Sequence, residues 1–172
     1  MLDVSLPALA GSDYIQPLPS RQIFSLAAFK NTRQELETTL GLELPSKPRR
    51  VVHGSVVYLW NGPNAWLVIG DNAIAQKTAG IAAVTDQSDG LFLFAVSGPH
   101  AVRILKKLMP IDLEKFARDE VAITIAAHIG VRLWQEAECF IIACFRSFAG
   151  SLHHALEEAS SEFKIVRDHN HA

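Results

Sequence analysis

The chain has 172 residues, of which 49% are hydrophobic and 20% charged, with a mean hydropathy of +0.16 and a formal net charge of −2. This length fits one domain, or one domain with an N-terminal extension, and a charge near zero without a clustered cationic face argues against nucleic-acid partners. No uninterrupted apolar run approaches the roughly 20 residues of a membrane-spanning helix, so the apolar content predicts a large core or a large partner interface.

The first 50 residues have little regular pattern. Prolines and glycine punctuate residues 1–30, so we expect an irregular arm that becomes ordered on a partner. A short helix should follow, because Thr32 and Glu35 have the spacing of a capping box and Gly41 can close the last turn. Residues 44–50 predict a connector. We therefore divide the chain into an N-terminal arm with one short helix, 1–50, and an α+β domain, 51–172.

The second part alternates strand and helix patterns. Residues 51–60, 65–69, 82–86 and 91–96 predict strands, joined as two hairpins through 61–64 and 87–90. Helices are expected after Asp71, from Ser97 to Pro110, and over 147–163. Residues 121–134 predict one extended segment bent near Gly130, and 139–145 a further strand.

From residue 65 onward the order of elements is β-α-β-β-α-β, followed by one more strand and a helix. This order predicts an α+β fold with a ferredoxin-like core, in which helices cover one face of an antiparallel sheet.

The two cysteines indicate a reducing environment. Cys139 and Cys144 lie five residues apart in an apolar segment, which would place them on opposite faces of one strand as free thiols. Residues 1–10 lack the basic start and apolar core of a signal peptide. We therefore expect a cytoplasmic protein.

Motifs of catalysis and metal binding are not found in the sequence. His153 and His154 would point about 100° apart on a helix, so they are poorly placed to bind one metal ion, and no metal site is expected. Cys144 has apolar neighbours and is interpreted as inert. Asp86 and Asp89 flank a turn, where aspartates usually accept hydrogen bonds from the backbone. No catalytic residue is assigned.

One short segment could bind an anion. Arg146 and Ser147 lie where a strand ends and a helix begins, and an arginine beside free helix N–H groups can hold a carboxylate or a phosphate. The alternative is that Arg146 pairs with a neighbouring acidic side chain, and that Ser147 only starts the helix.

Several segments together carry a family resemblance. They are residues 85–93, the run Ser97-Gly98-Pro99 with Ala101, residues 110–113, residues 127–134 and residues 146–149. In order and spacing they resemble the gamma subunit of heterotetrameric sarcosine oxidase. That family's fold is similar to the folate-binding domain of the glycine cleavage aminomethyltransferase, which agrees with the element order above.

The resemblance implies a role inside a larger enzyme. Such complexes oxidise sarcosine to glycine, pass electrons through flavin to oxygen, and transfer the one-carbon unit to tetrahydrofolate. It implies no cofactor in this chain, flavins, NAD and tetrahydrofolate in partner subunits, and the alpha, beta and delta subunits as partners. Nucleic-acid and membrane partners are not expected. Aminomethyltransferases carry acidic residues in a region comparable to Ile129–Trp134, where this chain has none. The resemblance therefore predicts a non-catalytic structural subunit that self-associates when isolated.

Two alternatives stay open. The chain could be a free-standing folate-binding or one-carbon-transfer protein, in which Arg146 and Ser147 would hold the glutamate carboxylate of folate. It could also be a regulatory adaptor of another amine-oxidising complex. Trp60, Trp66 and Trp134 could belong either to the core or to an interface.

Overall fold

The computed structural model describes residues 14–168, and describes side chains within residues 15–163. Its ten strands form two five-stranded sheets in which every neighbouring pair is antiparallel. Sheet A has the order β1 (Tyr14–Pro17), β7 (Leu91–Ser97), β10 (Cys139–Phe145), β9 (Ile129–Glu136) and β8 (Val121–Ala126). Sheet B has the order β3 (Arg50–His53), β4 (Val56–Gly62), β5 (Ala65–Ile69), β2 (Ile23–Ala28) and β6 (Ala82–Asp86).

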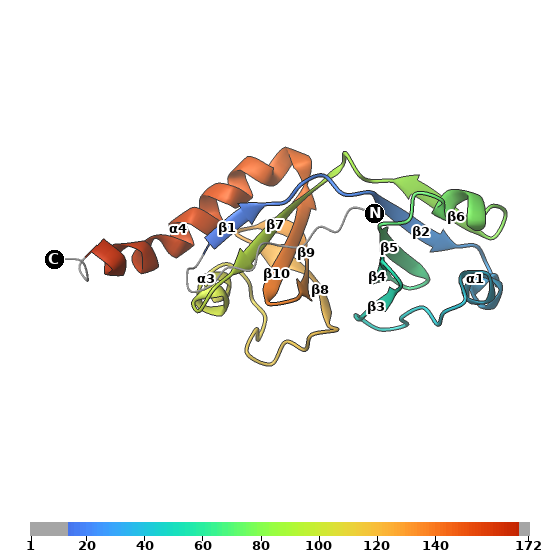
Figure 1. Ribbon diagram of the computed structural model, residues 1–172, viewed down its shortest axis with the longest axis horizontal. Coiled ribbons are helices and arrows are strands. Elements are labelled where there is room, and N and C mark those ends of the chain that lie inside the picture. The colour runs from blue at the N-terminus through green and yellow to red at the C-terminus, as the bar shows by residue number, and fades with distance from the viewer. Residues whose placement is uncertain (1–13, 169–172) are drawn as a thin grey trace.

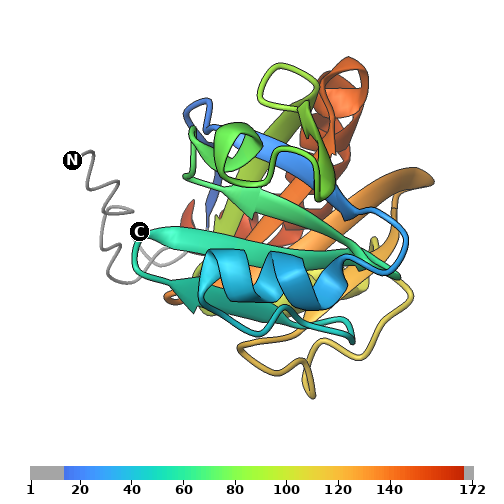
Figure 2. The same cartoon turned by 90° about the vertical axis from the view of Figure 1, so that its right-hand side faces the viewer.

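Helices cover the outer face of each sheet. Helices α1 (Arg33–Leu40) and α2 (Ile74–Lys77) belong to the side of sheet B, and α1 lies across that sheet in Figure 2. Helices α3 (Ala101–Lys106) and α4 (Ala149–Asp168) belong to the side of sheet A, at the opposite end of the molecule (Figure 1). A 3₁₀ turn, Arg146–Phe148, leads into α4.

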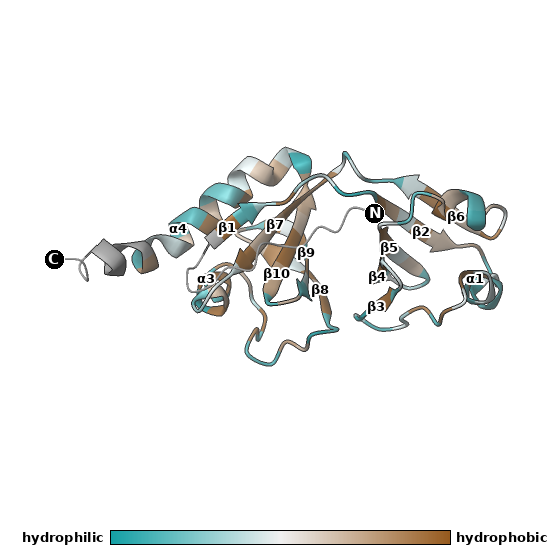
Figure 3. Ribbon diagram, viewed as in Figure 1, coloured by the Kyte–Doolittle hydropathy of each residue, from teal (hydrophilic) through white to brown (hydrophobic). Residues whose placement is uncertain are grey.

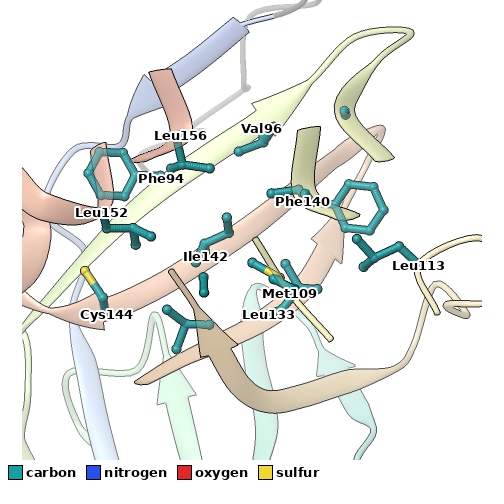
Figure 4. Packing of buried hydrophobic residues seen from close by; sticks show 14 residues of the cluster. Phe94, Val96, Met109, Leu113, Leu133, Phe140, Ile142, Cys144, Leu152 and Leu156 are labelled. Carbon is teal, nitrogen blue, oxygen red and sulfur yellow. The ribbon is translucent and has the colours of Figure 1, made fainter. Parts of the chain in front are cut away.

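Three apolar clusters hold these layers together. Alternation along each strand sends one set of side chains to the helices and the other set to the opposite sheet. In β10, for example, Ile142 and Cys144 pack with the helices, whereas Ile141 and Ala143 pack between the sheets. Figure 4 shows the cluster under α3 and α4, and Figure 3 shows hydrophobic residues concentrated on the strands of both sheets. The third cluster lies between sheet B and its two helices.

The α+β class and the antiparallel pairing are confirmed, as are the bounds of several elements. Helix α1 ends at Gly41, whose backbone is left-handed at φ 68°, and Leu36 is its buried residue. Strand β5 has the expected bounds, and β10 matches residues 139–145. Trp66 and Trp134 are fully buried core residues, whereas Trp60 is only partly buried.

The expected irregular arm over residues 1–30 is wrong for two of its segments. Strand β1 pairs with β7 in sheet A, and β2 lies between β5 and β6 in sheet B. Leu18, between the two strands, is buried among residues of both sheets. The two prolines, 17 and 19, mark the point where the chain passes from one sheet to the other. Residues 1–13 lie outside the described part of the chain.

The predicted hairpin of residues 82–86 and 91–96 is also wrong. The turn forms, with Gly90 donating its N–H to the Gln87 carbonyl, but β6 pairs with β2 and β7 pairs with β1 and β10. The two strands thus belong to different sheets. Crossing between sheets lets Leu91 and Leu93 bury their side chains between the sheets, which a local hairpin would not achieve.

Two long segments expected as single strands are hairpins. Residues 51–60 contain a turn at Gly54-Ser55 between β3 and β4. Residues 121–134 turn at Ala127 and His128, which both have positive φ, instead of bending at Gly130. Each hairpin adds two neighbouring strands to one sheet, β3 and β4 to sheet B and β8 and β9 to sheet A.

The two sheets are also joined at their edges through the backbone. Val121 donates its N–H to the Pro48 carbonyl at 3.0 Å, and Arg50 donates its N–H to the Asp119 carbonyl at 2.7 Å. No helix among the described residues is long and apolar enough to cross a membrane.

Candidate functional site

Arg146 begins the 3₁₀ turn after β10. Its Nε donates to the Asp89 carbonyl at 2.6 Å, and its guanidinium lies over the ring of Phe92, 5.5 Å from the centroid. Its backbone N–H donates to the Gly90 carbonyl at 2.9 Å. No described carboxylate forms an ion pair with this side chain. Arg146 therefore stabilises the turn at residues 87–90, where the chain passes from sheet B to sheet A. This structural role explains the arginine without a ligand.

The other polar residues singled out in the sequence are dispersed. Ser147 is exposed beside Arg146 in the same 3₁₀ turn. Asp86 accepts the Ser88 N–H at 2.8 Å, and this bonding lowers the pKa of the carboxyl, as expected for an aspartate of a turn. His153 lies 4.0 Å from Glu157, and no metal-binding cluster occurs among the described residues.

The two cysteines are free thiols. Cys144 is buried under the helices, and Cys139 is partly buried at the start of the same strand. Burial raises the pKa of both thiols, which keeps them protonated at neutral pH. A protonated, shielded thiol is a poor nucleophile, so neither residue is suited to covalent chemistry.

The inner face of sheet A has one end that sheet B leaves open, and we call it the open end. Ile123 and Ile125 of β8 and Phe145 of β10 are 49%, 48% and 51% exposed. The strand register places them on one face, because Ile123 is opposite Arg132, Arg132 is opposite Ala143, and Phe145 follows two residues later. None of the three belongs to the core clusters described above.

A glycine lies between these apolar side chains. Gly130 of β9 is directly opposite Ile125, and a methyl group built on it would meet no atom within 4 Å. The missing side chain at Gly130 therefore leaves a gap between the apolar side chains of the open end, and we call this gap the notch. Strand β8 forms the edge of the sheet at this point (Figure 1).

Arg132 supplies the charge of the open end. Its Nε donates to Oδ1 of Asn61 in sheet B at 2.5 Å, and burial lowers the pKa of the guanidinium. Sequence reasoning missed this residue, because a single arginine in an apolar strand has no motif. The signal available was an arginine that alternates with Gly130 and Trp134 on a face otherwise apolar.

This arrangement of apolar side chains around one cation suits macromolecular contact better than chemistry. It joins no nucleophile, base and acid at bonding distance, which catalysis by side chains would require. Exposed apolar patches on an otherwise buried sheet are typical of interaction sites.

Comparison with known proteins identifies the fold. No family model and no curated protein sequence matches the chain. Among solved structures, it is similar to a chain of the heterotetrameric sarcosine oxidase from Corynebacterium sp. U-96, in complex with pyrrole 2-carboxylate. The TM-score is 0.78 and the identity 24%, over 88% of this chain and 85% of that chain.

A second similarity is to the glycine cleavage system aminomethyltransferase T from Bartonella henselae. Its TM-score is 0.62 and its identity 11%, over 86% of this chain. This chain matches only 46% of that larger protein. The chain therefore has the α+β fold of part of an aminomethyltransferase and, over nearly its whole length, that of a chain of heterotetrameric sarcosine oxidase.

Proposed function

We propose that this chain is a non-catalytic structural subunit of an amine-oxidising complex of the sarcosine oxidase type. The observation that carries the proposal is the structural similarity, over 88% of its length, to a chain of a heterotetrameric sarcosine oxidase. The exposed apolar side chains of the open end support it, because a subunit needs a surface to bury.

In this proposal the chemistry belongs to the partner subunits. Flavins, NAD and tetrahydrofolate would be held by the larger alpha and beta subunits, the delta subunit would be a further partner, and the complex would oxidise sarcosine to glycine in the cytoplasm. Of the two residues that could have held folate, Arg146 already uses its Nε to bond the Asp89 carbonyl. This chain would then contribute shape and stability to the assembly.

Co-purification tests the proposal. The tagged chain is co-expressed with the flavoprotein subunits encoded by the same organism, and the flavin absorbance of the purified material is measured. We expect a stoichiometric complex that oxidises sarcosine, and no sarcosine oxidation by the chain alone. A chain that emerges without flavoprotein would contradict the proposal.

The open end can be tested in the same experiment. Changing Ile123 and Ile125 together to serine should reduce recovery of flavoprotein, because the apolar area at the contact is lost. The matched control is Val52→Ser, since Val52 is an equally exposed apolar strand residue, 54%, at the edge of sheet B.

The second candidate is a free-standing folate-binding protein, which the fold shared with the aminomethyltransferase favours. Calorimetric titration of the isolated chain with tetrahydrofolate separates the two. Heat corresponding to micromolar affinity would support the folate-binding candidate, and its absence would support the structural subunit.

A further inference from the structure

The guanidinium of Arg132 is incompletely paired. Asn61 accepts one hydrogen bond from it, and no carboxylate within residues 15–163 lies at ion-pair distance. Arg21, also partly buried, differs in having Glu136 as its partner at 2.8 Å. A charge partly removed from water is costly unless an opposite charge meets it, so a carboxylate brought to Arg132 would gain a strong, charge-assisted bond.

The glycine beside it has no internal explanation. Gly130 is not among the glycines with positive φ, so its backbone does not call for glycine, and a side chain there would meet open space. A β-branched residue would suit a strand better, and glycine weakens strand interiors. Glycine at this position leaves a gap between Ile125 and Phe145 that an incoming side chain could fill.

We infer that the open end receives an apolar segment of a partner flavoprotein subunit that carries a carboxylate, and that this carboxylate pairs with Arg132 while an apolar side chain fills the notch at Gly130. This inference rests on the proposed function. Arg132 and Gly130 are two residues apart on one strand face, which is about 7 Å. The partner segment must therefore present an acidic and an apolar side chain at that separation.

A second copy of this chain does not fit the same surface. A two-fold dimer through the open end would bring the same patch of both copies together, and with it Arg132 against Arg132. Like charges that meet at an interface disfavour association. The residues that define the open end include no carboxylate that could compensate, so the partner must supply it.

The test uses the complex formed with the flavoprotein subunits. Arg132→Glu and Arg132→Gln should reduce recovered flavin about tenfold or more, because the partner carboxylate would be left unpaired or repelled. Gly130→Val should reduce it by filling the notch. Val52→Glu places a charge in sheet B, on a valine about as exposed as Ile123 and Ile125, and should leave the recovered flavin unchanged. Thermal unfolding of each isolated variant separates loss of docking from loss of folding.

A cross-link identifies the partner group directly. Arg132→Lys keeps the positive charge and provides a primary amine, which a zero-length carbodiimide joins to a nearby carboxylate as an amide. Wild-type chain has no amine at this position and serves as the control. We expect a cross-linked peptide between position 132 and an aspartate or glutamate of a flavoprotein subunit, found by mass spectrometry.

The outcomes separate the inference from the proposal on which it rests. If wild-type chain recovers no flavoprotein, the proposed function fails and the inference fails with it. If the wild type and all three variants, at positions 132 and 130, recover equal flavin, only the inference is overturned. A cross-link from position 132 to a second copy of this chain would also overturn it. Reduced recovery by these variants with the heteromeric cross-link supports it.

Discussion

Arg21 and Glu136, 115 residues apart in the chain, form an ion pair in which Nη1 of Arg21 lies 2.9 Å and 2.8 Å from the two carboxylate oxygens. The side chains are only 14% and 16% exposed. Oε1 of Glu136 also accepts the indole N–H of Trp134 at 2.8 Å. This pair ties the connection between β1 and β2 to the end of β9.

Breaking this pair should destabilise the fold. Arg21→Ala leaves a partly buried carboxylate without its cation, and we expect the free energy of unfolding to fall by about 2 kcal/mol. Urea denaturation measures the change. The control is Arg49→Ala, which removes the exposed pair with Asp119 and should cost less than about 1 kcal/mol. Equal losses of unfolding free energy in the two variants would contradict the expectation that the partly buried Arg21 pair stabilises the fold more than an exposed pair does.

The turn between β8 and β9 offers a stabilising change. Ala127 and His128 have φ values of 47° and 69°, a conformation for which asparagine and glycine are favoured. Changing Ala127 to Asn and His128 to Gly should raise the free energy of unfolding by about 1 kcal/mol. Gly41→Ala is the opposite control, since it places a side chain at φ 68° and should destabilise. A decrease in stability of the Asn-Gly variant would refute the strain argument.

Arg146 should prove to be a structural residue. Arg146→Ala removes the hydrogen bond to the Asp89 carbonyl and the stacking on Phe92, and we expect a loss of about 1 kcal/mol in urea denaturation. Arg103→Ala, on the exposed side of α3, should cost less. If tetrahydrofolate binds the wild type and Arg146→Ala abolishes the heat of binding without changing stability, the side chain is a ligand group instead.

The thiols predict how stability depends on pH. Burial raises the pKa of Cys144 above that of an unfolded thiol, about 8.5, so the native state keeps a proton that the unfolded state loses. The stability due to this group is fully present below that pH and declines as pH rises through the raised value. We expect the free energy of unfolding to fall as the pH rises above about 8.5, with a shallower slope in Cys144→Ala. Parallel slopes would contradict the assignment.

Local signals predicted the elements that local chemistry determines. Gly41 ended α1, and Pro110 followed α3, because capping and missing N–H groups act within a few residues. Strand partners were not predictable in the same way. The turn at 87–90 has the composition of a hairpin, yet its two strands find partners more than 40 residues away, at Ser25 and Phe140. The pairing of strands depends on which apolar faces become buried against each other. A single sequence does not show which faces these are.

The open end was missed for a related reason. Exposure of Ile123 and Ile125 depends on how far sheet B extends over sheet A, which no local pattern encodes. The glycine at 130 was interpreted as a bend, whereas the turn lies at Ala127 and His128, where alanine carries no signal for positive φ. Arg146 was singled out correctly as a residue at a strand-to-helix junction, but its partner is a main-chain carbonyl.

The interleaving of the two sheets has a consequence for synthesis on the ribosome. Strands β1 and β2 are synthesised first. Strand β2 cannot pair until β5 and β6 have been synthesised, and β1 cannot pair until β7 has been synthesised. Sheet A lacks its central strand until residues 139–145 have been translated. The nascent chain therefore carries unpaired strands for most of its elongation, and a product that stops before residue 139 would expose the edges of β7 and β9 as templates for aggregation.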